Sequence, residues 1–196
     1  AAALARRGRR VLLVDLDSQA SASLSLGVPR SELAPSAYDL IRGKAKLVDV
    51  IRRTLTPNLS LITASADLAD LERTPPAKGA METQLSTVLQ AARPDFDHIL
   101  LDCPPWPNAA SVNAIAAADH LLIPVVPQFL AVEGVENLLG ATDRLRDKLG
   151  AGARPLGLIV SMADYRAKLA RKTVEALRSS QGTLVFAIEI RIRRFQ

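Results

Sequence analysis

Short apolar runs alternate along the chain with longer segments of helical periodicity. The apolar runs predict strands at residues 11–16, 59–64, 98–103, 120–126, 156–161 and 184–190. Most of these runs are apolar at nearly every position, which is typical of parallel strands covered on both faces. The segments with helical periodicity lie between them, at residues 36–42, 46–53, 80–92, 109–119, 132–149 and 166–179. This alternation predicts an α/β fold with a doubly wound, mostly parallel sheet and helices on both faces.

Two of the helical segments show which side is expected to face the core. In residues 132–149 one apolar stripe takes Val132, Val135, Leu138, Leu139, Thr142 and Leu145. In residues 166–179 the predicted core stripe is Leu169, Val174 and Leu177. Each stripe follows the three-to-four-residue spacing that places side chains on one face of a helix. Both helices are therefore expected to cover the sheet.

The two ends of the chain resemble interrupted elements. The opening AAALARRG has the composition of the last turns of a helix, rich in alanine, basic at its end and followed by a glycine stop at Gly8. The final FAIEIRIRRFQ ends on a strand-like alternation. We therefore expect residues 1–196 to be a single domain that is truncated at both ends, and we find no convincing boundary inside it.

Composition limits the possible classes of protein. A chain of 196 residues with 48% hydrophobic and 23% charged residues can bury one substantial core. A single cysteine, Cys103, cannot form an internal disulfide, and we expect it to be a small buried residue. There is no apolar run of membrane-spanning length and no signal-peptide pattern, so a cytoplasmic location is expected. The net charge of +5 favours polyanionic partners.

Three aspartates stand at the carboxyl ends of predicted strands. Asp15 and Asp17 follow the first apolar run, and Asp102 ends the run HILLDC. Ligands of open parallel sheets bind beyond the carboxyl ends of the strands, so these acids are expected at one edge. An apolar strand ending in aspartate is also the Walker B pattern, whose carboxylate holds Mg²⁺ beside nucleotide phosphates. A single strand-end aspartate is more often only a turn former.

Four stretches together resemble the ParA family of deviant Walker ATPases, which partition plasmids and chromosomes. They are VLLVDLDSQASASLSLG, LLDCPP, VNAIAAADHLLIPVVPQFLAVEGVENLL and IVSMADYRAKL, and they extend over almost the whole chain. The resemblance implies an AAA-type, P-loop NTPase-like domain that binds ATP and Mg²⁺ and dimerises on ATP. It also implies sequence-independent DNA binding, a ParB-type activator protein, a nucleoid-associated cytoplasmic location and no membrane partner.

The resemblance also assigns roles to residues of this chain. Asp17 matches the carboxylate that positions the attacking water, and Asp15 the carboxylate near Mg²⁺. Asp102 matches the Walker B acid, which is expected to hold the ion through water. Pro104 and Pro105 match the switch segment after Walker B, although prolines also simply terminate strands.

A basic face in the last third of the chain is a candidate for nucleic-acid contact. Arg166 matches a basic position of the family that is implicated in DNA binding. Lys168, Arg171 and Lys172 lie on one helical face close to it. Such a face can contact phosphates without reading bases, but it can equally be an ordinary solvated surface.

Two departures from the family pattern affect the expected activity. The phosphate loop, K-G-G-x-G-K-[ST]-[ST], does not occur in this sequence, and it would stand about ten residues before Ala1. Residues 1–196 alone are therefore expected not to hydrolyse ATP, although the complete protein would. The final IEIRIRRFQ lacks a Pro-Arg-Asn pattern often found near the adenine, and Arg191, Arg193 and Arg194 are candidates for binding anions instead.

Two alternative functions stay open at this stage. A MinD-like or other cargo-positioning ATPase of the same superfamily shares the aspartate pair, but Gln19 and the serine- and alanine-rich stretch that follows favour ParA. A degenerate, non-catalytic protein that binds DNA or a partner without nucleotide would also lack the phosphate loop. The sequence does not distinguish which cargo is moved.

Overall fold

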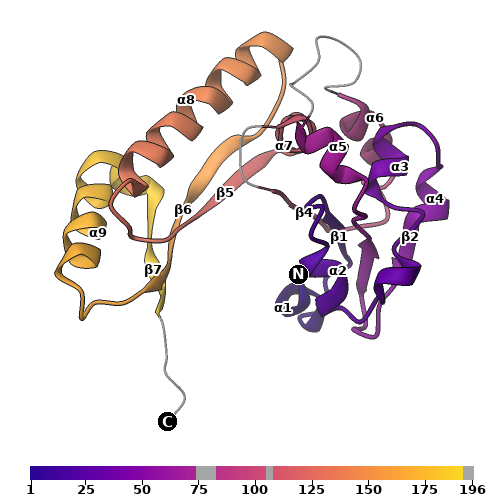
Figure 1. Ribbon diagram of the computed structural model, residues 1–196, viewed down its shortest axis with the longest axis horizontal. Coiled ribbons are helices and arrows are strands. Elements are labelled where there is room, and N and C mark those ends of the chain that lie inside the picture. The colour runs from indigo at the N-terminus through magenta and orange to yellow at the C-terminus, as the bar shows by residue number, and fades with distance from the viewer. Residues whose placement is uncertain (74–82, 105–107, 192–196) are drawn as a thin grey trace. The chain divides into compact units, whose positions relative to one another are not determined.

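The computed structural model describes residues 1–73, 83–104 and 108–191 (Figure 1). The chain divides into two compact units, Ala1–Ala118 and Asp119–Gln196. The expectation that residues 1–196 form one nucleotide-binding domain stays a prediction.

The first unit is built on a four-stranded sheet with the order β2-β3-β1-β4. The central strand β1 (Val11–Asp15) pairs in parallel with β3 (Leu59–Ile62) on one side and β4 (His98–Asp102) on the other. Strand β2 (Ile51–Arg53) pairs antiparallel with β3 at the edge. The sheet is thus mostly parallel, as the continuous apolar runs predict.

Helices cover both faces of this sheet because successive side chains of β1 point to opposite sides. Leu12 and Val14 belong to a buried cluster that takes residues from α3, α5, α6 and α7. Val11 packs in a second cluster with Ala5 of α1. The helical elements of this unit are α1 (Ala2–Arg6), α2 (Ser21–Ser25), η1 (Arg30–Glu32), α3 (Ala37–Ile41), α4 (Leu47–Val50), α5 (Leu68–Arg73), α6 (Gln84–Gln90) and α7 (Ala109–Ala117).

The second unit is built on a three-stranded parallel sheet with the order β5-β6-β7. Its elements are β5 (His120–Val125), α8 (Ala131–Leu149), β6 (Arg154–Ala163), α9 (Lys168–Gln181), η3 (Gly182–Leu184) and β7 (Val185–Arg191). One core joins the sheet to α8 and α9, with Val135 from α8 and Leu177 from α9 in contact with buried strand residues such as Val160. The stripe predicted for residues 132–149 therefore faces the core.

The structure corrects two of the element predictions. The helix predicted over residues 46–53 ends at Val50, and Ile51 begins an edge strand that pairs with Ile62. This tertiary pairing overrides the local helical pattern. Leu169, a predicted core residue of α9, is 49% exposed. The other two predicted core residues, Val174 and Leu177, are buried as expected, together with Ala170 and Thr173.

Candidate functional site

The carboxyl edge of the first sheet brings two of the predicted acids side by side. Asp15 ends β1 and Asp102 ends β4, and the two are register partners on these neighbouring parallel strands. The next backbone amide after Asp15, that of Leu16, donates to the carbonyl of Asp102 at 2.8 Å. Neighbouring strands lie about 4.8 Å apart, so both carboxylates leave the sheet at one place. The convergence expected from the strand ends is therefore present for this pair.

Asp15 is completely buried, and its carboxylate is held by the start of α2. Its Oδ2 accepts hydrogen bonds from the backbone amide of Ser23 at 2.8 Å and from the Ser23 hydroxyl at 2.7 Å. Its Oδ1 accepts a longer bond from the amide of Asp17, at 3.3 Å. A buried carboxylate is tolerated when donors of this kind surround it, and the amide end of a helix favours negative charge. Asp15 is thus fixed in one orientation.

Ser23 is a residue of this site that the sequence analysis did not identify. Its hydroxyl donates to Asp15 and also accepts a hydrogen bond from the amide of Ala64, just beyond the end of β3, at 3.1 Å. The side chain is fully buried and joins β1, α2 and the end of β3. One serine in a run of alternating serines carries no sequence signal that would distinguish it, because the contact depends on tertiary structure.

Asp17 lies in the turn between β1 and α2, partly exposed. Its Oδ1 accepts a hydrogen bond from the amide of Gln19 at 2.9 Å, and its carbonyl accepts one from Ala20 at 2.8 Å. The Ala20 backbone has a positive φ of 56°, which lets the chain turn sharply into α2. The turn therefore presents the Asp17 side chain near the sheet edge with one carboxylate oxygen not used in these contacts.

Asp102 is exposed, and no hydrogen bond reaches its carboxylate from any residue that the structure describes. Partial desolvation raises its pKa above the ordinary value, and the negative charges of Asp15 and Asp17 raise this pKa further. Asp15 is the register partner of Asp102, and Asp17 follows Asp15 by two residues, so the three acids lie at one end of the sheet. Acids grouped in this way repel each other unless a cation is present.

The carboxylate oxygens of these acids fit Mg²⁺ in chemical type, but their arrangement does not favour direct coordination. Hard carboxylate oxygens are the ligands that Mg²⁺ prefers, and the ion usually keeps several of its waters. Among residues 1–73, 83–104 and 108–191, no three or more His, Cys, Asp or Glu side chains are arranged to hold a metal directly. Because Asp15 is already engaged by Ser23, a role for Asp15 beside the ion through water fits this geometry better than direct coordination.

The segment after β4 contains three residues of interest. Pro104 is buried, whereas Pro105 lies outside the described residues, as do Trp106 and Pro107. The expectation that Cys103 is a buried residue is wrong, because it is exposed where the chain leaves the sheet. Desolvation of its sulfur and the neighbouring Asp102 charge nevertheless raise the pKa of the Cys103 thiol to about 12, so the thiol is protonated at neutral pH.

The four basic residues proposed for nucleic-acid contact all lie in the second unit and are exposed. Arg166 forms a two-point ion pair with Asp164, which includes a bond from Nε to Oδ1 of 2.7 Å. Arg171 donates from Nε to the carbonyl of Tyr165 at 2.8 Å. Lys168 and Lys172 have no ion pair with any described residue. The two lysines are therefore the most available charges of the predicted face, and Arg166 is the least available.

Comparison with known proteins places the chain in a family. The family described as "AAA domain" matches residues 1–152. The chromosome partitioning protein ParA of Caulobacter vibrioides is 34% identical over 186 residues, which are 94% of this chain and 70% of the relative. The chromosome-partitioning ATPase Soj of Treponema pallidum is 35% identical over 183 residues, which are 93% of this chain and 71% of that protein.

The solved structures agree with this fold. A cobyrinic acid a,c-diamide synthase from Mycobacterium smegmatis, with bound ATP analogue and magnesium, is 29% identical and superimposes with a TM-score of 0.85. The match covers 97% of this chain and 78% of that one. No described helix is long and apolar enough to cross a membrane. The residues matched by the family include Asp15, Asp17 and Asp102, and the chain belongs to the ParA family of P-loop NTPase-like proteins.

Proposed function

We propose that this chain forms part of an ATPase that partitions DNA, and that Asp15, Asp17 and Asp102 are its share of a magnesium–nucleotide site. The observation that carries this proposal is the pairing of Asp15 with Asp102 at the ends of β1 and β4, with Asp17 two residues further on. The relatives named for chromosome partitioning support it. ATP and Mg²⁺ are the proposed cofactors.

The proposed division of labour follows from how differently the three acids are held. Asp17 retains one carboxylate oxygen not used in its turn, and it would accept a hydrogen bond from the attacking water and orient it. Asp15 is fixed by Ser23, and together with Asp102 it would hold Mg²⁺ through water. The ion would supply neutralising charge for the phosphates, which phosphoryl transfer requires together with an oriented water.

The proposal extends to partners of the complete protein. We propose an ATP-dependent homodimer that binds DNA without sequence preference, a ParB-type activator and a nucleoid-associated, cytoplasmic location. The basic face of α9, with Lys168 and Lys172 foremost, would contact backbone phosphates. The switch role of Pro104 and Pro105 remains part of the proposal, with Pro104 buried beside the Walker B strand.

The catalytic proposal is tested with two forms of the protein. Residues 1–196 alone are expected to show no ATP turnover, because this sequence supplies no phosphate loop. A second form carries a strand and a K-G-G-x-G-K-[ST]-[ST] loop from a family member joined before Ala1, and it is expected to hydrolyse ATP with Mg²⁺. Robust Mg²⁺-dependent hydrolysis by residues 1–196 would show that the loop is dispensable.

Substitutions in the loop-bearing form test the role of Asp17. Asp17→Asn is expected to lower kcat by about a hundredfold or more, the range found for loss of a group that handles the reacting proton. ATP affinity should change by less than about threefold, since Asp17 is not assigned to hold the phosphates. The control is Asp95→Asn, which removes an exposed acid elsewhere on the same unit. Equal rates for the two variants would remove Asp17 from the mechanism.

A further inference from the structure

A partly buried carboxylate in the second unit gathers cationic groups from two elements. Glu189 of β7 accepts a hydrogen bond from the Tyr165 hydroxyl at 2.6 Å and one from Nη2 of Arg178 at 2.9 Å. Nε of Arg191 lies 3.6 Å from the same carboxylate, and its guanidinium also lies over the Tyr165 ring, 5.2 Å from the centroid. Only 12% of the Glu189 side chain is exposed. Its partners hold its pKa below the ordinary value, so it is ionised at neutral pH.

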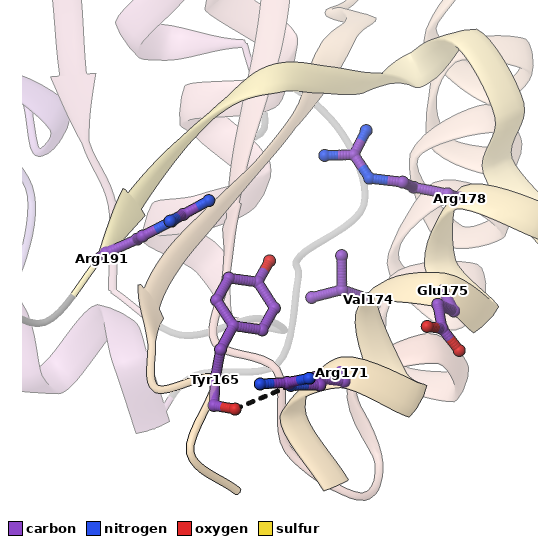
Figure 2. A pocket seen from close by; sticks show the side chains of 6 residues that line it. All are labelled: Tyr165, Arg171, Val174, Glu175, Arg178 and Arg191. Atoms are coloured by element: carbon purple, nitrogen blue, oxygen red, sulfur yellow. Dashed lines mark hydrogen bonds between the residues drawn. The ribbon is translucent and has the colours of Figure 1, made fainter. Parts of the chain in front are cut away.

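Three partners of Glu189, namely Tyr165, Arg178 and Arg191, border a cavity of about 410 Å³. It is lined by Tyr165, Arg171, Val174, Glu175, Arg178 and Arg191. Figure 2 shows Arg178, from α9, and Arg191, at the end of β7, extending toward the space above the Tyr165 ring. Arg171 is steadied by its bond to the Tyr165 carbonyl, which Figure 2 also shows. Three guanidinium groups thus surround one opening.

The charges do not cancel around this opening. Three arginines and one glutamate, Glu175, line the cavity. Glu189 pairs with two of these arginines, Arg178 and Arg191, whereas no hydrogen bond or ion pair joins Glu175 to a described residue. A guanidinium has five N–H donors in a planar fork, and the bonds described here use only some of them. The remaining donors are suited to the oxygens of a phosphate, which arginine often binds in a two-point geometry.

We infer that this cavity is a binding site for a phosphate group and that Glu189 acts as its built-in competitor. The Glu189 carboxylate accepts the hydrogen bonds of Arg178 and Tyr165 and forms an ion pair with Arg191, so it takes the contacts that a phosphate would otherwise make. The cavity therefore binds phosphate weakly while Glu189 keeps its charge. The phosphate has two possible sources, the DNA backbone or a free anion. Only the DNA source depends on the function proposed above.

The decisive experiment compares two substitutions that change the net charge equally. Glu189→Gln weakens the competition for the arginines, whereas Glu175→Gln removes an unpaired charge on the rim of the same cavity. Binding is measured for residues 1–196 with a labelled DNA duplex over a series of salt concentrations, and separately with inorganic tripolyphosphate. We expect Glu189→Gln to bind at least about fivefold more tightly than Glu175→Gln. With DNA, the salt slope should also steepen by about one phosphate contact, a slope change near 0.9.

The two probes separate the sources and the two proposals. A gain with both probes identifies a general phosphate site, and a gain with DNA alone identifies the backbone as its ligand. If no form binds DNA but the tripolyphosphate order holds, the proposed DNA binding fails while this inference stands. Equal affinities of the two glutamine variants for both probes would overturn the inference.

A second comparison keeps the inference testable if Glu189→Gln does not fold. Arg178 is held by Glu189 and by the carbonyl of Phe186, whereas Arg171 lines the same cavity and is bonded to the Tyr165 carbonyl but not to Glu189. In the otherwise unchanged chain, Arg178→Gln should therefore weaken binding of tripolyphosphate less than Arg171→Gln, although each removes one positive charge. Lys172→Gln, outside the cavity lining, is the control for net charge. A loss from Arg178→Gln as large as that from Arg171→Gln would show that Glu189 does not compete for Arg178, and a loss from Arg171→Gln no larger than that from Lys172→Gln would show that the cavity does not bind the phosphate.

Discussion

Replacing Ser23 with alanine tests whether the buried serine holds the Asp15 carboxylate in place. The substitution removes the hydroxyl that donates to Asp15 at 2.7 Å and accepts from the Ala64 amide at 3.1 Å. The backbone amide of Ser23 keeps its own bond to Asp15, at 2.8 Å. The variant therefore loses two contacts of one side chain and keeps the helix start.

The expected cost follows from these two losses. A hydrogen bond to a charged group contributes about 1.5–3 kcal/mol, and a buried amide left without an acceptor costs about 1–3 kcal/mol. Partial relaxation of the loop reduces the sum, so we expect Ser23→Ala to lower the free energy of unfolding of the first unit by about 3 kcal/mol. The loss should appear as early opening at the junction of β1, α2 and the end of β3.

The assay is urea denaturation combined with hydrogen exchange resolved by peptide, because exchange reports the first unit separately from the second. The Ala64 amide should lose protection more than amides of the second unit. The matched control is Ser25→Ala in the same short helix, where the side chain is exposed and the expected change is within about 0.5 kcal/mol. A Ser23→Ala variant as stable as Ser25→Ala would refute the reasoning.

Two further predictions concern charge and packing. Asp102→Asn should stabilise the first unit by less than about 1 kcal/mol, since exposure screens the repulsion it relieves. The pKa of Asp102 is raised in the folded state, so ionisation of this carboxyl opposes folding. The stability gained by Asp102→Asn should therefore be absent at low pH and grow as the pH rises above about 4. Urea midpoints measured at several pH values check this dependence. In the second unit, Gly157→Ala should destabilise by about 1–3 kcal/mol, because its new Cβ would lie 2.6 Å from the Phe186 ring. Gly134→Ala, where nothing lies within 4 Å, should stabilise α8 by about 0.5–1 kcal/mol, and a thermal melt of both variants checks the contrast.

Most of the parallel strands are predictable because a buried strand is apolar at nearly every position, and this is visible in the local sequence. The runs that begin at Val11, Leu59, His98 and His120 all become strands at nearly the predicted bounds. A short run that is apolar at nearly every position is excluded from water when both faces of its strand are covered, as in a parallel sheet. The edge strand at Ile51 was not predicted, because residues 46–53 have a helical pattern of apolar positions. Ile51 takes a strand conformation only because it pairs with Ile62 of the neighbouring strand.

The candidate site divides in the same way. The sequence determined the identity and order of the acids, since Asp15 and Asp102 each end an apolar run. It also determined the basic character of α9. Tertiary structure decided the burial and the partners of each group. Asp15 is buried and hydrogen-bonded to Ser23, Asp102 is exposed on the neighbouring strand, and Arg166 is ion-paired with Asp164.

The physical reason is the range of the interactions involved. Burial of a strand and the face of a helix follow from residues within a few positions, so a single sequence carries them. The partner of a charged group is set by contacts between distant segments, as Glu189 of β7 with Tyr165 and Arg178 illustrates. The sequence by itself therefore determined which acidic and basic residues are candidates for the site, and the tertiary structure decided which of these charges are paired within the protein and which are available to a ligand.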